Sequence, residues 1–249
     1  MIAQEEALWK QITKSRKISS IDPAWLARNY CANLSKELRF IIAERLGWLG
    51  SQGWEFIKVL IEKQGIQEEL IYAAGLCYQT EAKEWLYEQL RVRPNYKLEI
   101  LRSLACWGGD IPIELLQEIL SEKSQAIRLA GLDLLNFKAH QLDDKSILKV
   151  LEEPLKDFRD PVLLKTIHIL QKRNGEKVCR EITKLIMHGS KEVSKAGLIA
   201  LGSIANSNSQ KALLKLIQKL GSGPQKDLAK KQLKHQYNYK KQILFNQFL

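Results

Sequence analysis

The sequence repeats a plan of two amphipathic helices roughly every 30 residues, and this period constrains the fold more than any other feature. The plan is clearest in residues 190–220, SKEVSKAGLIALGSIANSNSQKALLKLIQKL. Apolar residues recur at helical spacing from Val193 to Ile204, NSNS breaks the pattern, and a second apolar stripe runs from Ala212 to Leu220. Each helix leaves an apolar side that only a neighbouring pair can cover.

Further segments follow the same plan, at residues 38–63, 70–90, 97–120, 126–155 and 161–187. A leucine late in each first helix serves as an anchor. The anchors are Leu46, Leu76, Leu104, Leu135, Leu170 and Leu201, at intervals of 30, 28, 31, 35 and 31 residues. About six helix pairs at a near-constant period predict an all-α fold, an elongated α-solenoid that winds as a right-handed superhelix.

We expect a single domain over residues 1–249, with the repeats at 36–220 and a cap at each end. Residues 1–35 predict an atypical N-terminal cap pair, in which Asp22-Pro23 starts a helix. Residues 225–249 predict a basic C-terminal capping helix. The longest interval between anchors coincides with residues 137–144, FKAHQLDD, where we expect a longer loop.

The charge is concentrated at the C-terminal end of the chain. The net charge is +11, and residues 210–249 carry nine lysines against one acid, Asp227. The predicted electrostatic patch consists of Lys226, Lys230, Lys231, Lys234, Lys240 and Lys241. These lysines admit three interpretations: a solvated cap, a docking site for an acidic protein, or contacts to nucleic-acid phosphates. Lysine without arginine argues against reading of bases, which favours bidentate arginine contacts.

The sequence also bears on compartment and on bound metals. The first residues, MIAQEEALWKQITKSRK, lack the apolar core of a secretory signal, and no apolar run approaches the length of a membrane span. The four cysteines, Cys31, Cys77, Cys106 and Cys179, lie far apart without paired spacing. We therefore expect buried thiols in a reducing, cytoplasmic compartment, with no disulfide framework, no metal site and no membrane partner.

Aromatic residues follow the anchors at nearly constant offsets. Trp48, Tyr78, Trp107 and Phe137 fall two, two, three and two positions after their anchors. Stacked repeats would align them along one edge, either as a ridge that binds a partner or as packing between repeats. Trp54 and Trp85 start second helices, where we expect packing.

No catalytic constellation emerges from the sequence. The segment CWGGD, residues 106–110, is similar to the pairing of an aromatic and a carboxylate in HEAT-like DNA glycosylases. Helix punctuation is the simpler interpretation, with Gly108-Gly109 ending one helix in a left-handed conformation and Asp110 capping the next. The four histidines are scattered, and we predict no catalytic residue.

The segment VSKAGLIALGSIANSNSQKALLKLI resembles the short HEAT-like repeat of phycobilisome lyase-type proteins. The matching residues are Ala200-Leu201-Gly202 late in the first helix, the polar turn at 206–209, and the second helix from Ala212 to Leu216. Arg45-Leu46-Gly47 is the next closest match, and the resemblance covers roughly residues 36–220. It departs from the pattern in two ways. Asp-Pro before the first helix survives only at Asp160-Pro161, and the early arginine only at Arg39 and Arg128.

This resemblance implies a HEAT-like α-solenoid similar to E/F-type bilin lyase subunits and related chaperone-like proteins. It implies non-enzymatic recognition of an acidic protein, either a phycobiliprotein or a second HEAT-repeat subunit. No cofactor is expected, with bilin as a conceivable ligand or substrate. Two alternatives remain open: a nucleic-acid-binding solenoid, including a glycosylase-like enzyme, and a bilin lyase or isomerase in its own right.

Overall fold

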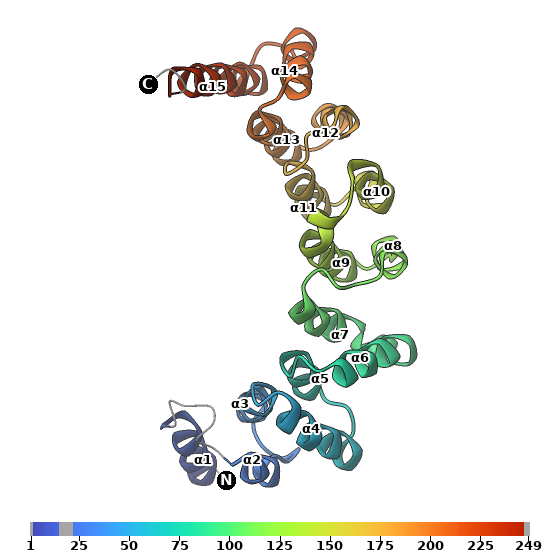
Figure 1. Cartoon of the computed structure of the whole chain (residues 1–249), viewed down its shortest axis with the longest axis vertical. Helices are drawn as coiled ribbons and strands as arrows, with labels where there is room; N and C mark the ends of the chain where they lie inside the picture. The colour runs from blue at the N-terminus through green and yellow to red at the C-terminus, as the bar shows by residue number, and fades with distance from the viewer. Residues whose placement is uncertain (1, 15–21, 247–249) are drawn as a thin grey trace. The chain divides into compact units, whose positions relative to one another are not determined.

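The computed structural model describes residues 2–14 and 22–246, and every regular element in these ranges is a helix (Figure 1). The chain divides into two compact units, unit 1 at Met1–Ile111 and unit 2 at Pro112–Leu249. Within each unit the helices alternate between two rows, so that each pair covers the apolar side of the next. The all-α fold of the HEAT-like α-solenoid kind is therefore confirmed.

Unit 1 begins with α1 (Ile2–Lys14) and α2 (Pro23–Asn29). The predicted start at Asp22-Pro23 is present, because the Asp22 carboxylate accepts hydrogen bonds from two backbone amides of the first turn of α2. The remaining elements are α3 (Lys36–Gly47), α4 (Ser51–Gln64), α5 (Glu68–Leu76), α6 (Thr80–Val92), η2 (Pro94–Tyr96), α7 (Lys97–Leu104) and η3 (Ala105–Trp107). Helices α3, α5 and α7 pack in succession as the first row, and α4 and α6 belong to the second row.

Unit 2 continues the alternation. Its elements are α8 (Ile113–Ser121), α9 (Gln125–Lys138), η4 (Ala139–Gln141), α10 (Asp144–Val150), η5 (Pro154–Lys156), α11 (Asp160–Leu170), α12 (Glu176–His188), α13 (Lys191–Ile204), α14 (Ser207–Lys219) and α15 (Pro224–Asn246). Helices α9, α11 and α13 form the first row, and α8, α10, α12 and α14 form the second. Helix α15 packs against α13 and α14 at the end of this series.

Glycine allows the first-row helices of unit 1 to approach each other closely. A β-carbon on Gly47 of α3 would lie 2.8 Å from the carbonyl oxygen of Ala73 in α5. One on Gly75 of α5 would lie 2.7 Å from the carbonyl oxygen of Ser103 in α7. Real β-carbons do not approach a backbone oxygen so closely, so glycine sets the spacing between these helices.

The anchor leucines lie where the repeat predicts them. The fully buried anchors are Leu46, Leu104, Leu135, Leu170 and Leu201, while Leu76 is only partly buried. The small residue three positions before an anchor is also buried at Ala43 and Ala73. The core is therefore continuous within each unit and uses the same positions of successive repeats.

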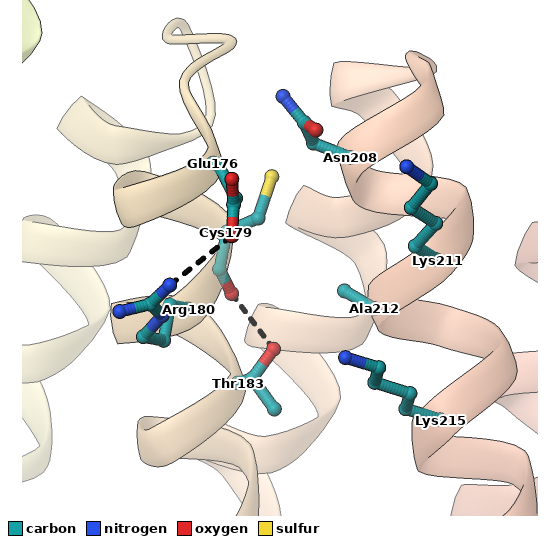
Figure 2. A pocket seen from close by; sticks show the side chains of 8 residues that line it. All are labelled: Glu176, Cys179, Arg180, Thr183, Asn208, Lys211, Ala212 and Lys215. Carbon is teal, nitrogen blue, oxygen red and sulfur yellow. Dashed lines mark hydrogen bonds and ion pairs between the residues drawn. The ribbon is translucent and has the colours of Figure 1, made fainter.

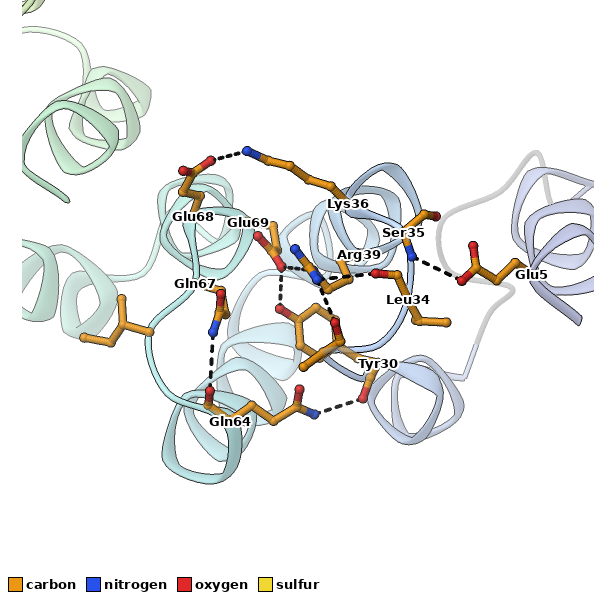
Figure 3. Close-up of polar contacts among 12 residues, drawn as sticks. Glu5, Tyr30, Leu34, Ser35, Lys36, Arg39, Gln64, Gln67, Glu68 and Glu69 are labelled. Carbon is orange, nitrogen blue, oxygen red and sulfur yellow. Dashed lines mark hydrogen bonds and ion pairs between the residues drawn. The ribbon is translucent and has the colours of Figure 1, made fainter. Parts of the chain in front are cut away.

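A second link between repeats is polar and recurs with the same period. The Arg39 guanidinium donates from Nε to the buried Glu69 carboxylate, 2.6 Å away and one repeat ahead, as Figure 3 shows. The Tyr30 hydroxyl donates to the same oxygen over 2.8 Å. Arg128 repeats the contact with the buried Asp157 over 2.6 Å. Both arginines also donate to carbonyls of the preceding turn, which explains why an arginine occupies these two positions.

We expect Tyr30→Phe to lower the free energy of unfolding of unit 1 by about 1.5 kcal/mol, because Glu69 loses a hydrogen bond inside the protein. Burial, and after it the hydrogen bond to the Glu69 carboxylate, raises the pKa of Tyr30 far above its usual value, so the hydroxyl stays protonated and donates at neutral pH. Urea unfolding followed by tryptophan fluorescence measures the change. Tyr78→Phe is the control, since that hydroxyl makes no described hydrogen bond and its loss should change stability little.

No helix within the described ranges combines the length and the apolar character needed to cross a membrane.

Candidate partner-binding surfaces

A groove of about 370 Å³ lies between α12 and α14 of unit 2 (Figure 2). Its lining residues are Glu176, Cys179, Arg180, Thr183, Asn208, Lys211, Ala212 and Lys215. Arg180 pairs with Glu176 over 3.1 Å, and the Thr183 hydroxyl donates to the carbonyl of Cys179 over 2.7 Å. Lys211 and Lys215 are exposed and form no ion pair within the described part of the chain. The groove therefore carries net positive charge on its α14 wall.

Local structure positions the two groove lysines on one face of α14. Asn206 begins the helix with a capping box, in which its side-chain oxygen accepts from the Ser209 amide over 2.8 Å and the Ser209 hydroxyl accepts from the Asn206 amide. The Asn206 side chain also donates to the Asn174 carbonyl, over 2.6 Å, which ties this start to the loop before α12. Residues four apart in a helix share a face, so Lys211 and Lys215 project together.

The groove cysteine, Cys179, is a buried free thiol. Burial is the main cause that raises the pKa of Cys179 to about 11, so its thiol is protonated at neutral pH. Burial raises the pKa of Cys77 in unit 1 to about 12. The expectation that all four cysteines are buried is wrong for Cys31 and Cys106, which are exposed.

Further lysines of the second row extend the positive charge beyond the groove. Six exposed lysines on α10, α12 and α14 have no described ion-pair partner: Lys145, Lys149, Lys177, Lys211, Lys215 and Lys219. The acids of α12, in contrast, are paired, Glu176 with Arg180 and Glu181 with Lys184. The sequence analysis counted Lys211, Lys215 and Lys219 among the nine lysines of residues 210–249, but it placed the predicted patch on the later lysines of α15.

Helix α15 holds the lysines that the sequence singled out. It docks through Gln236, whose amide donates to the Leu201 carbonyl over 2.7 Å. Lys226 donates to a carbonyl in the preceding turn, and Lys230 lies 4.0 Å from Asp227. Lys231 and Lys234 are exposed, while Lys240 and Lys241 lie outside the residues whose side chains are described.

The predicted aromatic residues lie at helix ends and are not buried between repeats. Trp48 is 43% exposed and Tyr78 is 64% exposed. The Trp107 ring stacks on Tyr78 with 5.6 Å between centroids and 16° between planes. Phe137, 46% exposed, belongs to unit 2.

The equivalent groove of unit 1, between α4 and α6, is acidic. It contains Trp54 and Trp85, whose rings lie 5.8 Å apart, together with Lys58 and four glutamates, Glu62, Glu81, Glu84 and Glu88. The Trp54 indole donates to Glu81 over 2.9 Å, and Trp54 is 2% exposed. Packing is thus the role of this tryptophan, as the sequence predicts.

The segment at 106–110, which is similar to part of a glycosylase site, lies in the turn between α7 and α8. Gly108 ends the turn at a φ of 57°, a left-handed conformation that favours glycine. Asp110 does not cap the next helix as expected, because α8 begins one turn later with Pro112 as its N-cap. Asp110 instead pairs with Lys83. Within the described ranges no three His, Cys, Asp or Glu side chains gather as a metal site would require.

No protein-family model matches this sequence, and no curated protein matches it. Several solved structures are similar. Human deoxyhypusine hydroxylase in complex with glycerol is 15% identical over 94% of this chain and 88% of its own, with a TM-score of 0.41. An engineered protein is 17% identical over 94% of this chain and 71% of its own, with a TM-score of 0.50. A designed armadillo repeat protein is 17% identical over 86% and 99%, with a TM-score of 0.35. At these identities the likeness concerns the fold alone.

Proposed function

We propose that this protein is a non-enzymatic recognition protein that binds an acidic partner protein through the groove between α12 and α14. The observation that carries this proposal is the pair Lys211 and Lys215, which lie one turn apart on the groove wall without ion-pair partners in the described chain. Unpaired ammonium groups beside a groove favour carboxylates of a partner and accelerate its encounter. The buried, protonated Cys179 thiol offers no competing chemistry.

A protein is a better candidate than a nucleic acid for this groove. The one arginine that lines it, Arg180, pairs with Glu176, and the remaining cations are lysines, which lack the bidentate donors that favour base edges. The resemblance to phycobilisome lyase-type repeats makes an acidic phycobiliprotein the specific candidate. In that role the protein would hold the subunit while a bilin is attached or the complex assembles.

We expect Lys211→Glu/Lys215→Glu to weaken binding of a purified phycobiliprotein subunit at least about tenfold at 150 mM salt, because two attractions become repulsions. Calorimetry or biolayer interferometry measures the affinity. The matched control is Lys191→Glu/Lys195→Glu, an exposed lysine pair of equal spacing on α13. Lys230→Glu/Lys234→Glu tests the alternative that the partner docks on helix α15.

Three results would contradict this function. The α13 control could weaken binding as much as the groove variant, which would indicate a general charge effect. The α15 variant alone could abolish binding, which would place the site outside the groove. Binding from lysate could also disappear on nuclease treatment, which would favour the nucleic-acid alternative.

A further inference from the structure

We propose that unit 1 carries a second docking surface, which binds an amphipathic segment of a partner protein that presents apolar side chains and a carboxylate. The surface consists of the aromatic row, defined as Trp48, Tyr78 and Trp107, together with Arg45. This inference rests on the proposed function, in that the chain binds an acidic partner protein, and it assigns the chemistry of a separate contact.

The aromatic row lies at the ends of three helices that contact one another. Trp48 is the C-cap of α3, Tyr78 follows α5, and Trp107 ends the turn after α7. The glycine contacts of α3 with α5 and of α5 with α7 bring these ends together. Neighbouring repeats therefore present their aromatic residues side by side.

The fold leaves these aromatic side chains partly uncovered. Trp48 and Tyr78 are among the most exposed large apolar residues of unit 1. Tyr78 and Trp107 stack on each other, so they form a flat aromatic platform with one outer side. Tryptophan, tyrosine and arginine are the residues that most often dominate the binding energy of protein interfaces.

The backbone at Tyr78 supports a role for its side chain. Its φ is 52°, a left-handed conformation that costs free energy for any residue with a β-carbon and that glycine adopts without strain. A bulky tyrosine at this position is less favourable for folding than glycine or asparagine. Backbone strain of this kind is most common at functional positions, where the side chain is retained for its role in binding or catalysis.

Arg45 supplies the specificity for a carboxylate. Its guanidinium lies 5.3 Å from the centre of the Trp48 ring, and no described acid forms an ion pair with it. A guanidinium that lies against an aromatic ring and pairs with no described acid suits the two oxygens of a partner's carboxylate.

The test uses a helical peptide of about 15 residues, four helical turns, with a Leu/Phe stripe flanked by glutamates. Two variants of this peptide are measured beside it. The lysine peptide has lysine in place of each glutamate, and the serine peptide has serine in place of each apolar residue. Binding is measured by fluorescence anisotropy on the Lys211→Glu/Lys215→Glu chain, which removes the groove. Because this variant lacks the groove lysines, a failure of the proposed groove function does not affect the result. The serine peptide, measured on the unmodified chain, detects binding to the groove alone.

We expect the acidic amphipathic peptide to bind this chain, and the lysine and serine peptides to bind at least about tenfold more weakly. Trp48→Ala should weaken binding at least about tenfold. Arg45→Gln should weaken it about fivefold for the acidic peptide and not for the lysine peptide. Tyr78→Asn, which fits the left-handed turn, should weaken binding while it preserves the fold.

Phe158→Ala is the matched control, because Phe158 is an aromatic residue of unit 2 that is 87% exposed. Far-UV circular dichroism checks that each variant is folded. The proposal is overturned if the acidic peptide fails to bind at about 1 mM, an affinity too weak for recognition. It is also overturned if Phe158→Ala weakens binding as much as Trp48→Ala, or if the lysine peptide binds as tightly as the acidic one.

Discussion

Gly53→Ala is expected to destabilise unit 1 by about 3 kcal/mol, the upper end of the usual cost of overpacking. Gly53 lies in the first turn of α4, where the chain has just reversed from α3. A β-carbon there would overlap the carbonyl oxygen of Leu46 and lie 2.8 Å from its carbonyl carbon. Because both obstacles are backbone atoms, neither can rotate away, and the α3–α4 pair must open to accept the methyl group.

Tryptophan fluorescence isolates this effect, since all six tryptophans precede residue 108 and therefore lie in unit 1. We expect the fluorescence transition in urea to move to lower denaturant concentration. Gly221→Ala is a control in unit 2, followed by far-UV circular dichroism, because a β-carbon at Gly221 meets no atom within 4 Å and the stability of that unit should change by less than about 0.5 kcal/mol. An equal response of the two variants would show that the α3–α4 turn is not tight.

Asp157→Asn is expected to destabilise unit 2 by at least about 3 kcal/mol, because it leaves two guanidiniums without their counter-charge. The Asp157 side chain is fully buried and accepts from Arg128 over 2.6 Å and from Arg159 over 2.7 Å. The substitution keeps the shape of the side chain and removes only its charge. Far-UV circular dichroism follows the helices of both units and tryptophan fluorescence follows unit 1 alone, so the two together isolate unit 2, which contains no tryptophan.

The same carboxylate predicts a pH dependence of stability. Hydrogen bonds from Arg159 are the main cause that holds the pKa of Asp157 well below its usual value, and Arg128 adds to this. The folded state thus binds its proton less readily than the unfolded state, whose pKa is about 3.9. The contribution is present above pH about 4 and is lost as the pH falls toward the lower folded pKa.

Asp157→Asn should therefore lose less stability than the unmodified protein between pH about 5 and 2. Asp227→Asn is the control, since Asp227 is exposed and its one pair, to Lys230, spans 4.0 Å. Parallel pH profiles for all three proteins would contradict the role of Asp157.

Much of the fold could be predicted because the helix pairs are local. The anchors Leu104, Leu135, Leu170 and Leu201 are buried as the period requires. The expected longer loop at 137–144 is instead largely ordered by the short helix η4 at Ala139–Gln141, a turn too short to leave a periodic apolar signal. The partly buried Leu76 shows that the pattern marks a position in the repeat, while burial depends on the neighbouring helix.

The candidate surfaces were less predictable. The sequence identified Trp48, Tyr78 and Trp107 by their offsets, but it could not decide between packing and exposure. It placed the basic site on α15, because lysines cluster there along the chain. The groove at Lys211 and Lys215 depends on the packing of α14 beside α12, two helices whose acids and bases lie far apart along the chain.

The sequence by itself determined the all-α repeat, its period and the core positions, because apolar periodicity and helix punctuation act over a few turns of one chain segment. Only the tertiary structure decided which charges remain unpaired and which aromatic residues stay uncovered. Arg39 and Arg128 are neutralised by acids one repeat away, whereas Arg45, Lys211 and Lys215 are not. Such pairing depends on distances between side chains of separate repeats, which the spacing of residues along the chain does not record.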